Sequence, residues 1–68
     1  MSEQEEAQIA ARAAAHRTIA ECQRELRRLR ALINSDDADV RALAHGQWDD
    51  VSARYRAALG VLEEAADA

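Results

Sequence analysis

The sequence contains no proline, no phenylalanine and no lysine, only two glycines and a single cysteine. Proline is the strongest breaker of a helix interior, so its absence permits long uninterrupted helices. One cysteine cannot form a disulfide within the chain, which excludes the disulfide-stapled class of small domains. Trp48 and Tyr55 are the only aromatic residues. A core built on aromatic side chains is therefore excluded as well.

Long apolar segments are also missing. Runs such as Ala13-Ala14-Ala15 fall far short of the roughly 18 apolar residues of a membrane span. The acidic start, Ser2-Glu3-Gln4-Glu5-Glu6, lacks the basic and apolar regions of a secretory signal. We therefore expect a cytoplasmic protein that has no membrane partner.

The net charge is −4, from 13 acidic residues against nine arginines, which argues against non-specific nucleic-acid binding. The charge is unevenly distributed along the chain. Residues 1–35 hold six arginines and five carboxylates, whereas residues 36–68 hold three arginines and eight carboxylates. The two halves should attract each other as antiparallel neighbours.

Apolar residues recur at helical spacing in two segments separated by one polar turn, Asn34-Ser35-Asp36-Asp37. Spacings of three and four residues place them along one side of each helix, as in a coiled-coil seam. The pattern predicts a single helical-hairpin domain over residues 1–68, with helices at about 3–34 and about 37–66 and a turn at about 34–37. The first stripe is Ala15, Ile19, Cys22, Leu26, Leu29 and Ile33, and the second is Val40, Ala44, Trp48, Val51, Tyr55, Ala58, Leu62 and Ala65.

Local signals support both helix starts. Ser2 followed by Glu5 has the capping-box pattern, and Asp36 followed by Asp39 is similar to it, so we expect Ser2 and Asp36 to cap the helices. Gly46 is the one position that could divide the second helix. Because the seam continues in phase across it, we predict an unbroken helix.

Two long helices joined by so short a turn must lie antiparallel, which gives an all-α hairpin. In the expected register, residues that face each other have numbers that sum to about 73. Arg24 then lies opposite Asp49 and Asp50, where a cross-helix ion pair is expected. The expected core pairs are Leu29 with Ala44, Cys22 with Val51, Ala15 with Ala58, and Ile19 with Tyr55.

A lone hairpin leaves part of each stripe uncovered, and we expect Leu32, Leu43, Leu59 and Val61 to be exposed in it. Because burial of apolar surface contributes about 25 cal/mol per Å², leaving several such side chains exposed costs the hairpin several kcal/mol of stabilising free energy. We therefore expect a homodimer that forms a four-helix bundle. Small residues on the back of the second helix, including Gly46 and Gly60, could also admit a neighbouring backbone. The residues expected in the core or the dimer interface are Ile19, Cys22, Leu26, Leu29, Ile33, Val40, Leu43, Val51, Tyr55, Leu59 and Leu62.

No pattern indicates catalysis or metal binding. A nucleophile needs an adjacent base, and neither His16 nor His45 neighbours Cys22 in the expected register. One cysteine and two histidines at these spacings match no zinc template. We expect no enzymatic activity, no cofactor, no metal and no small-molecule substrate.

Five arginines of the first helix are the richest candidate for partner binding, and Trp48, with His45 one turn earlier, is a further candidate. They could bind an acidic protein surface or, less readily, a nucleic acid. The structural alternative is that Arg24 pairs with Asp49 or Asp50, that Arg28 pairs with Glu21 or Glu25, and that Trp48 belongs to the core. The arginines are Arg17, Arg24, Arg27, Arg28 and Arg30.

Residues 34–39 (Asn-Ser-Asp-Asp-Ala-Asp) are similar to the turn of the Rop family of plasmid copy-number regulators, and residues 55–59 (Tyr-Arg-Ala-Ala-Leu) resemble a segment of that family's second helix, at a spacing that differs by one residue. The resemblance implies a hairpin that pairs with a second copy and binds RNA loops. Alignment of the turns places Arg17, Glu21, Glu25 and Leu32 on the family's RNA-contacting face. Two carboxylates and a leucine are poor ligands for RNA, so the resemblance is architectural and carries no function over.

These observations favour a small non-enzymatic regulator or inhibitor, of the kind that phages and plasmids encode, which acts as a hairpin dimer docked on a partner protein. Two alternatives remain open. One is a Rop-like RNA-binding regulator that uses the basic patch from Arg24 to Arg30, and the other is a purely structural assembly module.

Overall fold

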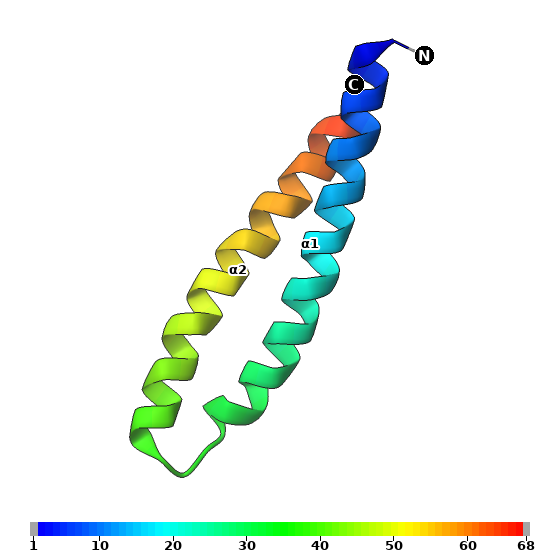
Figure 1. Cartoon of the computed structure of the whole chain (residues 1–68). Helices are drawn as coiled ribbons and strands as arrows, with labels where there is room; N and C mark the ends of the chain where they lie inside the picture. The colour runs from blue at the N-terminus through cyan, green and yellow to red at the C-terminus, as the bar shows by residue number, and fades with distance from the viewer. Residues whose placement is uncertain (1, 68) are drawn as a thin grey trace.

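The computed structural model describes residues 2–67, with side chains for residues 2–64. Two helices, α1 (Glu3–Ile33) and α2 (Ala38–Asp67), lie side by side and antiparallel, so that the start of α1 and the end of α2 lie at the same end of the hairpin (Figure 1). The prediction of an all-α helical hairpin is confirmed. Gly46 does not interrupt α2. Within the described part of the chain, neither helix is long and apolar enough to cross a bilayer.

Helix α1 begins where the sequence predicts. The Ser2 Oγ accepts a hydrogen bond from the Glu5 backbone N–H at 3.3 Å, which satisfies one of the free donors of the first turn. Three carboxylates in that turn, Glu3, Glu5 and Glu6, face the positive end of the helix dipole. The start of α1 is therefore held by both a cap and a favourable charge.

The turn differs from the prediction by one residue. Asp37, not Asp36, caps α2, because its Oδ1 accepts from the backbone N–H groups of Asp39 at 2.9 Å and Val40 at 3.4 Å. Ser35 supports this geometry twice. Its Oγ accepts from the Asp37 N–H at 3.2 Å, and its carbonyl accepts from the Arg41 guanidinium at 2.8 Å. Arg41 thereby ties the second turn of α2 to the connection.

The core is a single seam between the helices. Its buried residues are the three pairs whose numbers sum to 73, as the expected register requires. Leu29 and Cys22, each 1% exposed, are the largest fully buried side chains. Half-buried apolar side chains pack against the seam from one side. The buried residues are Ala15, Cys22, Leu29, Ala44, Val51 and Ala58, and the half-buried ones against them include Leu26, Ile33, Trp48 and Tyr55.

Two expectations about individual residues need correction. The ion pair across the hairpin joins Glu25 to Arg54, with 2.8 Å between Oε2 and Nη2, and is the only one among residues 2–64, so the expected pair from Arg24 is wrong. Leu59, which was expected to be exposed, is half-buried and lies one helical turn from the half-buried Tyr55. Leu43 is 65% exposed, as expected for a lone hairpin. The side chain of Ala65 lies outside the described residues.

Candidate interaction faces

Each helix packs against only one other helix, so the hairpin has two broad faces, one on either side of the seam. We call the first the groove face, because a groove at its open end continues into a hollow at its centre, with Arg54 lining both. The groove face comprises Ala11, Ala14, Thr18, Glu25, Arg28, Gln47, Asp50, Arg54, Ala57 and Val61.

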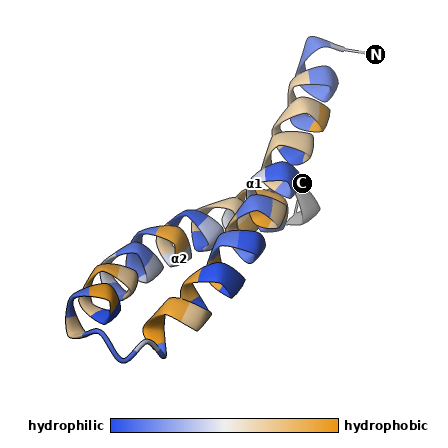
Figure 2. Ribbon diagram, turned by 60° about the horizontal axis from the view of Figure 1, so that its bottom comes forward, coloured by the Kyte–Doolittle hydropathy of each residue, from blue (hydrophilic) through white to orange (hydrophobic). Residues whose placement is uncertain are grey.

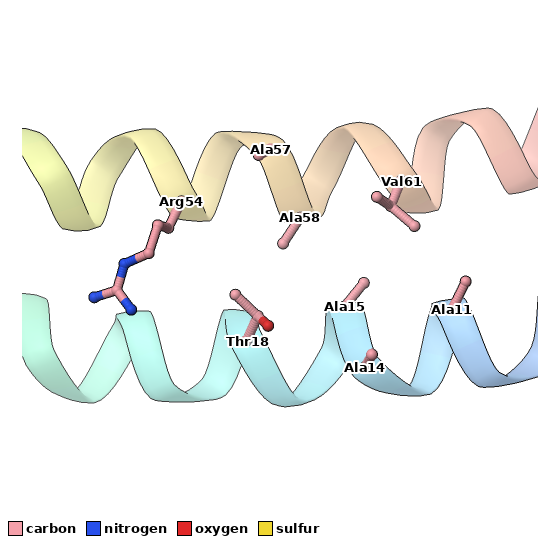
Figure 3. A pocket seen from close by; sticks show the side chains of 8 residues that line it. All are labelled: Ala11, Ala14, Ala15, Thr18, Arg54, Ala57, Ala58 and Val61. Atoms are coloured by element: carbon pink, nitrogen blue, oxygen red, sulfur yellow. The ribbon is translucent and has the colours of Figure 1, made fainter.

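The groove arises because both helices carry small residues near the open end. Ala15 and Ala58 face each other in the seam, and the residues that flank them are also small (Figure 3). The result is an open groove of about 400 Å³ with an almost entirely apolar lining. Arg54 reaches from α2 toward α1 at one end of it, and Val61 lines the other.

The centre of the groove face is charged, with two residues of each sign. Glu25 and Arg54 form the ion pair across the seam, and Arg28 and Asp50 line the same hollow. Both members of the ion pair are partly in water, with side-chain exposures of 39% and 55%. The centre is therefore neutral and presents both a donor and an acceptor to whatever covers it.

Two large leucines extend the groove face to the turn. Leu32 follows Glu25 by seven residues and Leu43 precedes Asp50 by seven, so each lies on the same side of its helix as that central residue. Leu32 is 40% and Leu43 65% exposed. Hydrophobic segments gather on both helices at the turn end of the hairpin (Figure 2). The groove face thus has protruding leucines at one end and a small-residue groove at the other.

We call the opposite side of the seam the aromatic face. Gln23, Leu26, Arg27 and Tyr55 line a shallow hollow in it. Seven-residue steps from Leu26 and Tyr55 extend it along both helices through half-buried side chains. These further residues are Ile19, Ile33, Trp48 and Leu62, with Leu59 one turn from Tyr55.

The edges of the aromatic face are basic. We define them as positions about 80° to 140° round each helix from its core-facing line, on the aromatic side. Among residues 2–64, the carboxylates at such positions are Glu5 and Glu63, both at the open end. The arginines there are Arg12, Arg27, Arg30 and Arg56, together with Arg41, whose guanidinium donates to the Ser35 carbonyl.

The five arginines that the sequence grouped together lie on three different sides of α1, and all are exposed. Arg27 and Arg30 belong to the edge of the aromatic face, while Arg28 lies on the groove face. Arg17 and Arg24, seven residues apart, share the outer surface of α1. The hairpin does not bring the five together into one patch.

The remaining candidate residues differ in how far they are exposed. His45 is exposed, whereas Trp48 is half-buried and packs against the core cluster. His16 is exposed and Cys22 is buried in the seam. Within the described residues, no group of three or more histidine, cysteine or carboxylate side chains could hold a metal ion.

No family model, curated protein or solved structure matches the chain. The assignment of function therefore rests on the residues of the two faces.

Proposed function

We propose that the chain is a non-enzymatic protein-interaction module of the cytoplasm, which pairs with a second copy through the groove face and docks on another protein as a four-helix bundle. The observation that carries the proposal is the placement of Leu32, Leu43 and Val61. All three are exposed, and all three lie on the same side as the alanine-lined groove. Covering this side removes most of the hairpin's exposed large apolar surface from water.

The two ends of the groove face complement each other. In an antiparallel face-to-face pair, the turn end of one copy lies over the open end of the other. Leu32 and Ala14 are equally distant from residue 23 of α1, and Leu43 and Ala57 are equally distant from residue 50 of α2. A two-fold axis that crosses the helices at this level therefore places Leu32 and Leu43 of each copy over the small-residue groove of the other copy. The mixed charges of Glu25, Arg28, Asp50 and Arg54 lie beside the axis.

The exposed area of the hairpin also favours a partner. The chain exposes 5198 Å², whereas a compact monomer of this mass exposes about 4200 Å². The difference is close to the roughly 800 Å² that each partner contributes to a stable interface. One covered face thus brings the exposed area to that of an ordinary small domain.

Sedimentation equilibrium across micromolar concentrations tests the pairing, with Leu43→Glu as the decisive variant. Leu43 is mostly exposed in the hairpin, so glutamate there should alter hairpin stability by only about 0.5 kcal/mol. In the groove-face dimer the same change buries a charge, and we expect a monomer. Ala42→Glu, one position earlier on the outer surface of α2, is the matched control and should remain a dimer.

Two outcomes would overturn the pairing. One is a wild-type chain that sediments as a monomer and still melts cooperatively. The other is a Leu43→Glu variant that remains dimeric, because the copies would then meet through another surface.

A further inference from the structure

The aromatic face lies on the side of the hairpin that groove-face pairing leaves open. We propose that it binds an acidic amphipathic helix of another protein. The apolar side chains of that helix rest on Leu26, Tyr55 and Leu59, and its carboxylates pair with the arginine edges. The inference rests on the proposed function, because it names the partner of the same interaction module.

The apolar part of the face is a shallow stripe between two helices, along which a third helix can lie. Leu26 and Tyr55 come from different helices and line one hollow between them. The half-buried stripe runs from Ile19 to Ile33 on α1, which is about 21 Å of helix and matches about four turns of a partner. The half-buried side chains of Tyr55 and Trp48 add rigid aromatic contact area to the stripe.

The charges of the aromatic face favour a partner of negative charge. Arginines occupy both edges between the turn and the open end, and the carboxylates at such positions stay at the open end. A second copy on this face would bring arginine edges against arginine edges and be repelled. Glutamates of an acidic helix would instead meet guanidinium groups, which bind carboxylates through two parallel hydrogen bonds.

The apolar stripe also distinguishes a protein from a nucleic acid. Phosphates could use Arg27 and Arg30 but would leave Ile19, Leu26 and Leu59 without a partner. Base stacking needs exposed aromatic faces, whereas Trp48 packs against the core and Tyr55 is half-buried. The overall charge of −4 repels a nucleic acid and an acidic helix alike, so the apolar stripe, and not the net charge, distinguishes the two partners.

Trp48 provides the measurement, because it is the only tryptophan and belongs to this face. The probe is an acetylated and amidated peptide of about 18 residues, with leucines at positions i, i+3, i+4 and i+7 and glutamates flanking them. We expect titration to shift the Trp48 emission to shorter wavelength and to saturate. The binding should weaken several-fold between low and high salt. A peptide with lysine in place of each glutamate should not bind.

Substitutions on α1 test the location of the site. Arg27→Glu combined with Arg30→Glu should weaken binding of the acidic peptide by at least about tenfold. Arg17→Glu combined with Arg24→Glu makes the same change in net charge on the outer surface of α1 and should leave the affinity within about twofold. At Gln23, which lines the hollow, Gln23→Glu should weaken and Gln23→Lys should strengthen the binding. Equal losses from both arginine pairs would overturn the location.

The same titration on the Leu43→Glu monomer separates this inference from the proposed pairing. Binding of the acidic peptide to the monomer supports the aromatic face even where pairing has failed. Absence of binding to both wild type and monomer overturns the inference while leaving the dimer untouched. A structured RNA that displaces the peptide and loses affinity in the Arg27→Glu, Arg30→Glu variant would assign the face to nucleic acid instead. Tighter self-association of that variant would assign it to a second copy.

Discussion

Gly46 and Gly60 give the clearest prediction at the scale of single residues, because the conformation of α2 does not require glycine at either position. Neither has a positive φ, and apart from the adjacent residues and the surrounding helix backbone, a Cβ added at either would meet no atom within 4 Å. Alanine should therefore stabilise α2 by about 1 kcal/mol at each position. For a domain of this size that corresponds to a rise in Tm of about 4–8 °C per substitution, measured by circular dichroism.

The reverse change supplies the control for the glycine variants. Ala53→Gly, at another exposed position of α2, should lower the Tm by a similar amount. The result also tests whether the back of α2 is a contact surface between copies. If a neighbouring backbone packed closely there, Gly46→Ala would weaken the dimer in sedimentation instead of only raising the Tm. That outcome would contradict the assignment of pairing to the groove face.

At the scale of the helices, the ion pair between Glu25 and Arg54 joins α1 to α2 at the centre of the groove face. Both side chains are substantially exposed in the hairpin, so screening by water limits their attraction. A double-mutant cycle with Glu25→Gln and Arg54→Gln, in the monomeric Leu43→Glu background, should give a coupling energy below about 1 kcal/mol. Urea denaturation at low salt and in 1 M NaCl should show that the coupling falls with salt.

The dimer provides the comparison for this cycle. Pairing through the groove face removes Glu25 and Arg54 from water, so the coupling energy should be larger in the wild-type background and less sensitive to salt. The same small, salt-sensitive coupling in both backgrounds would mean that the pair stays exposed in the dimer. The centre of the groove face would then not be covered.

The helices and their core were predictable because their signals are local and periodic. The seam needs only the three- and four-residue spacing of apolar residues, and six of the predicted seam residues are the six buried ones. A proline-free chain with one Asn-Ser-Asp-Asp turn leaves no other topology for two such stripes. The same spacing also predicted that Leu32, Leu43 and Val61 would be exposed in a hairpin.

The details that sequence reasoning missed depend on side-chain reach and on the turn. The register set Arg24 opposite Asp49 and Asp50, but Arg24 lies on the outer surface of α1. Glu25, next along the chain, lies beside the seam and meets Arg54. The sequence does not distinguish Asp36 from Asp37 as a helix cap, because both are aspartates in the same turn. Only the geometry of the turn decides that Asp37 caps α2. The small groove was missed because alanines read as neutral, although residues that line it recur at seven-residue spacing, Ala11 with Thr18 on α1 and Arg54 with Val61 on α2.

At the scale of the whole molecule, the hairpin is a rod of 54 × 16 × 13 Å whose two long sides are the groove face and the aromatic face. Its radius of gyration is 15.8 Å, against about 11 Å for a compact chain of this length. A rod offers long faces and small ends, so extensive contacts are possible only along its sides. Pairing through the groove face would leave two aromatic faces pointing in opposite directions. The assembled molecule would then bind two acidic helices.

Small-angle X-ray scattering tests this arrangement without any substitution. Helices pack about 10 Å apart, so a second copy laid face to face raises the radius of gyration by only about 1 Å while the scattering mass doubles. The longest dimension should stay near the 54 Å of the single hairpin. Copies joined end to end would instead roughly double both the radius of gyration and the longest dimension, because the centres of the two rods would then lie about a rod length apart. A concentration series in which mass rises while the longest dimension grows would therefore rule out side-by-side pairing. The Leu43→Glu variant, at the same concentrations, should keep the mass of one chain.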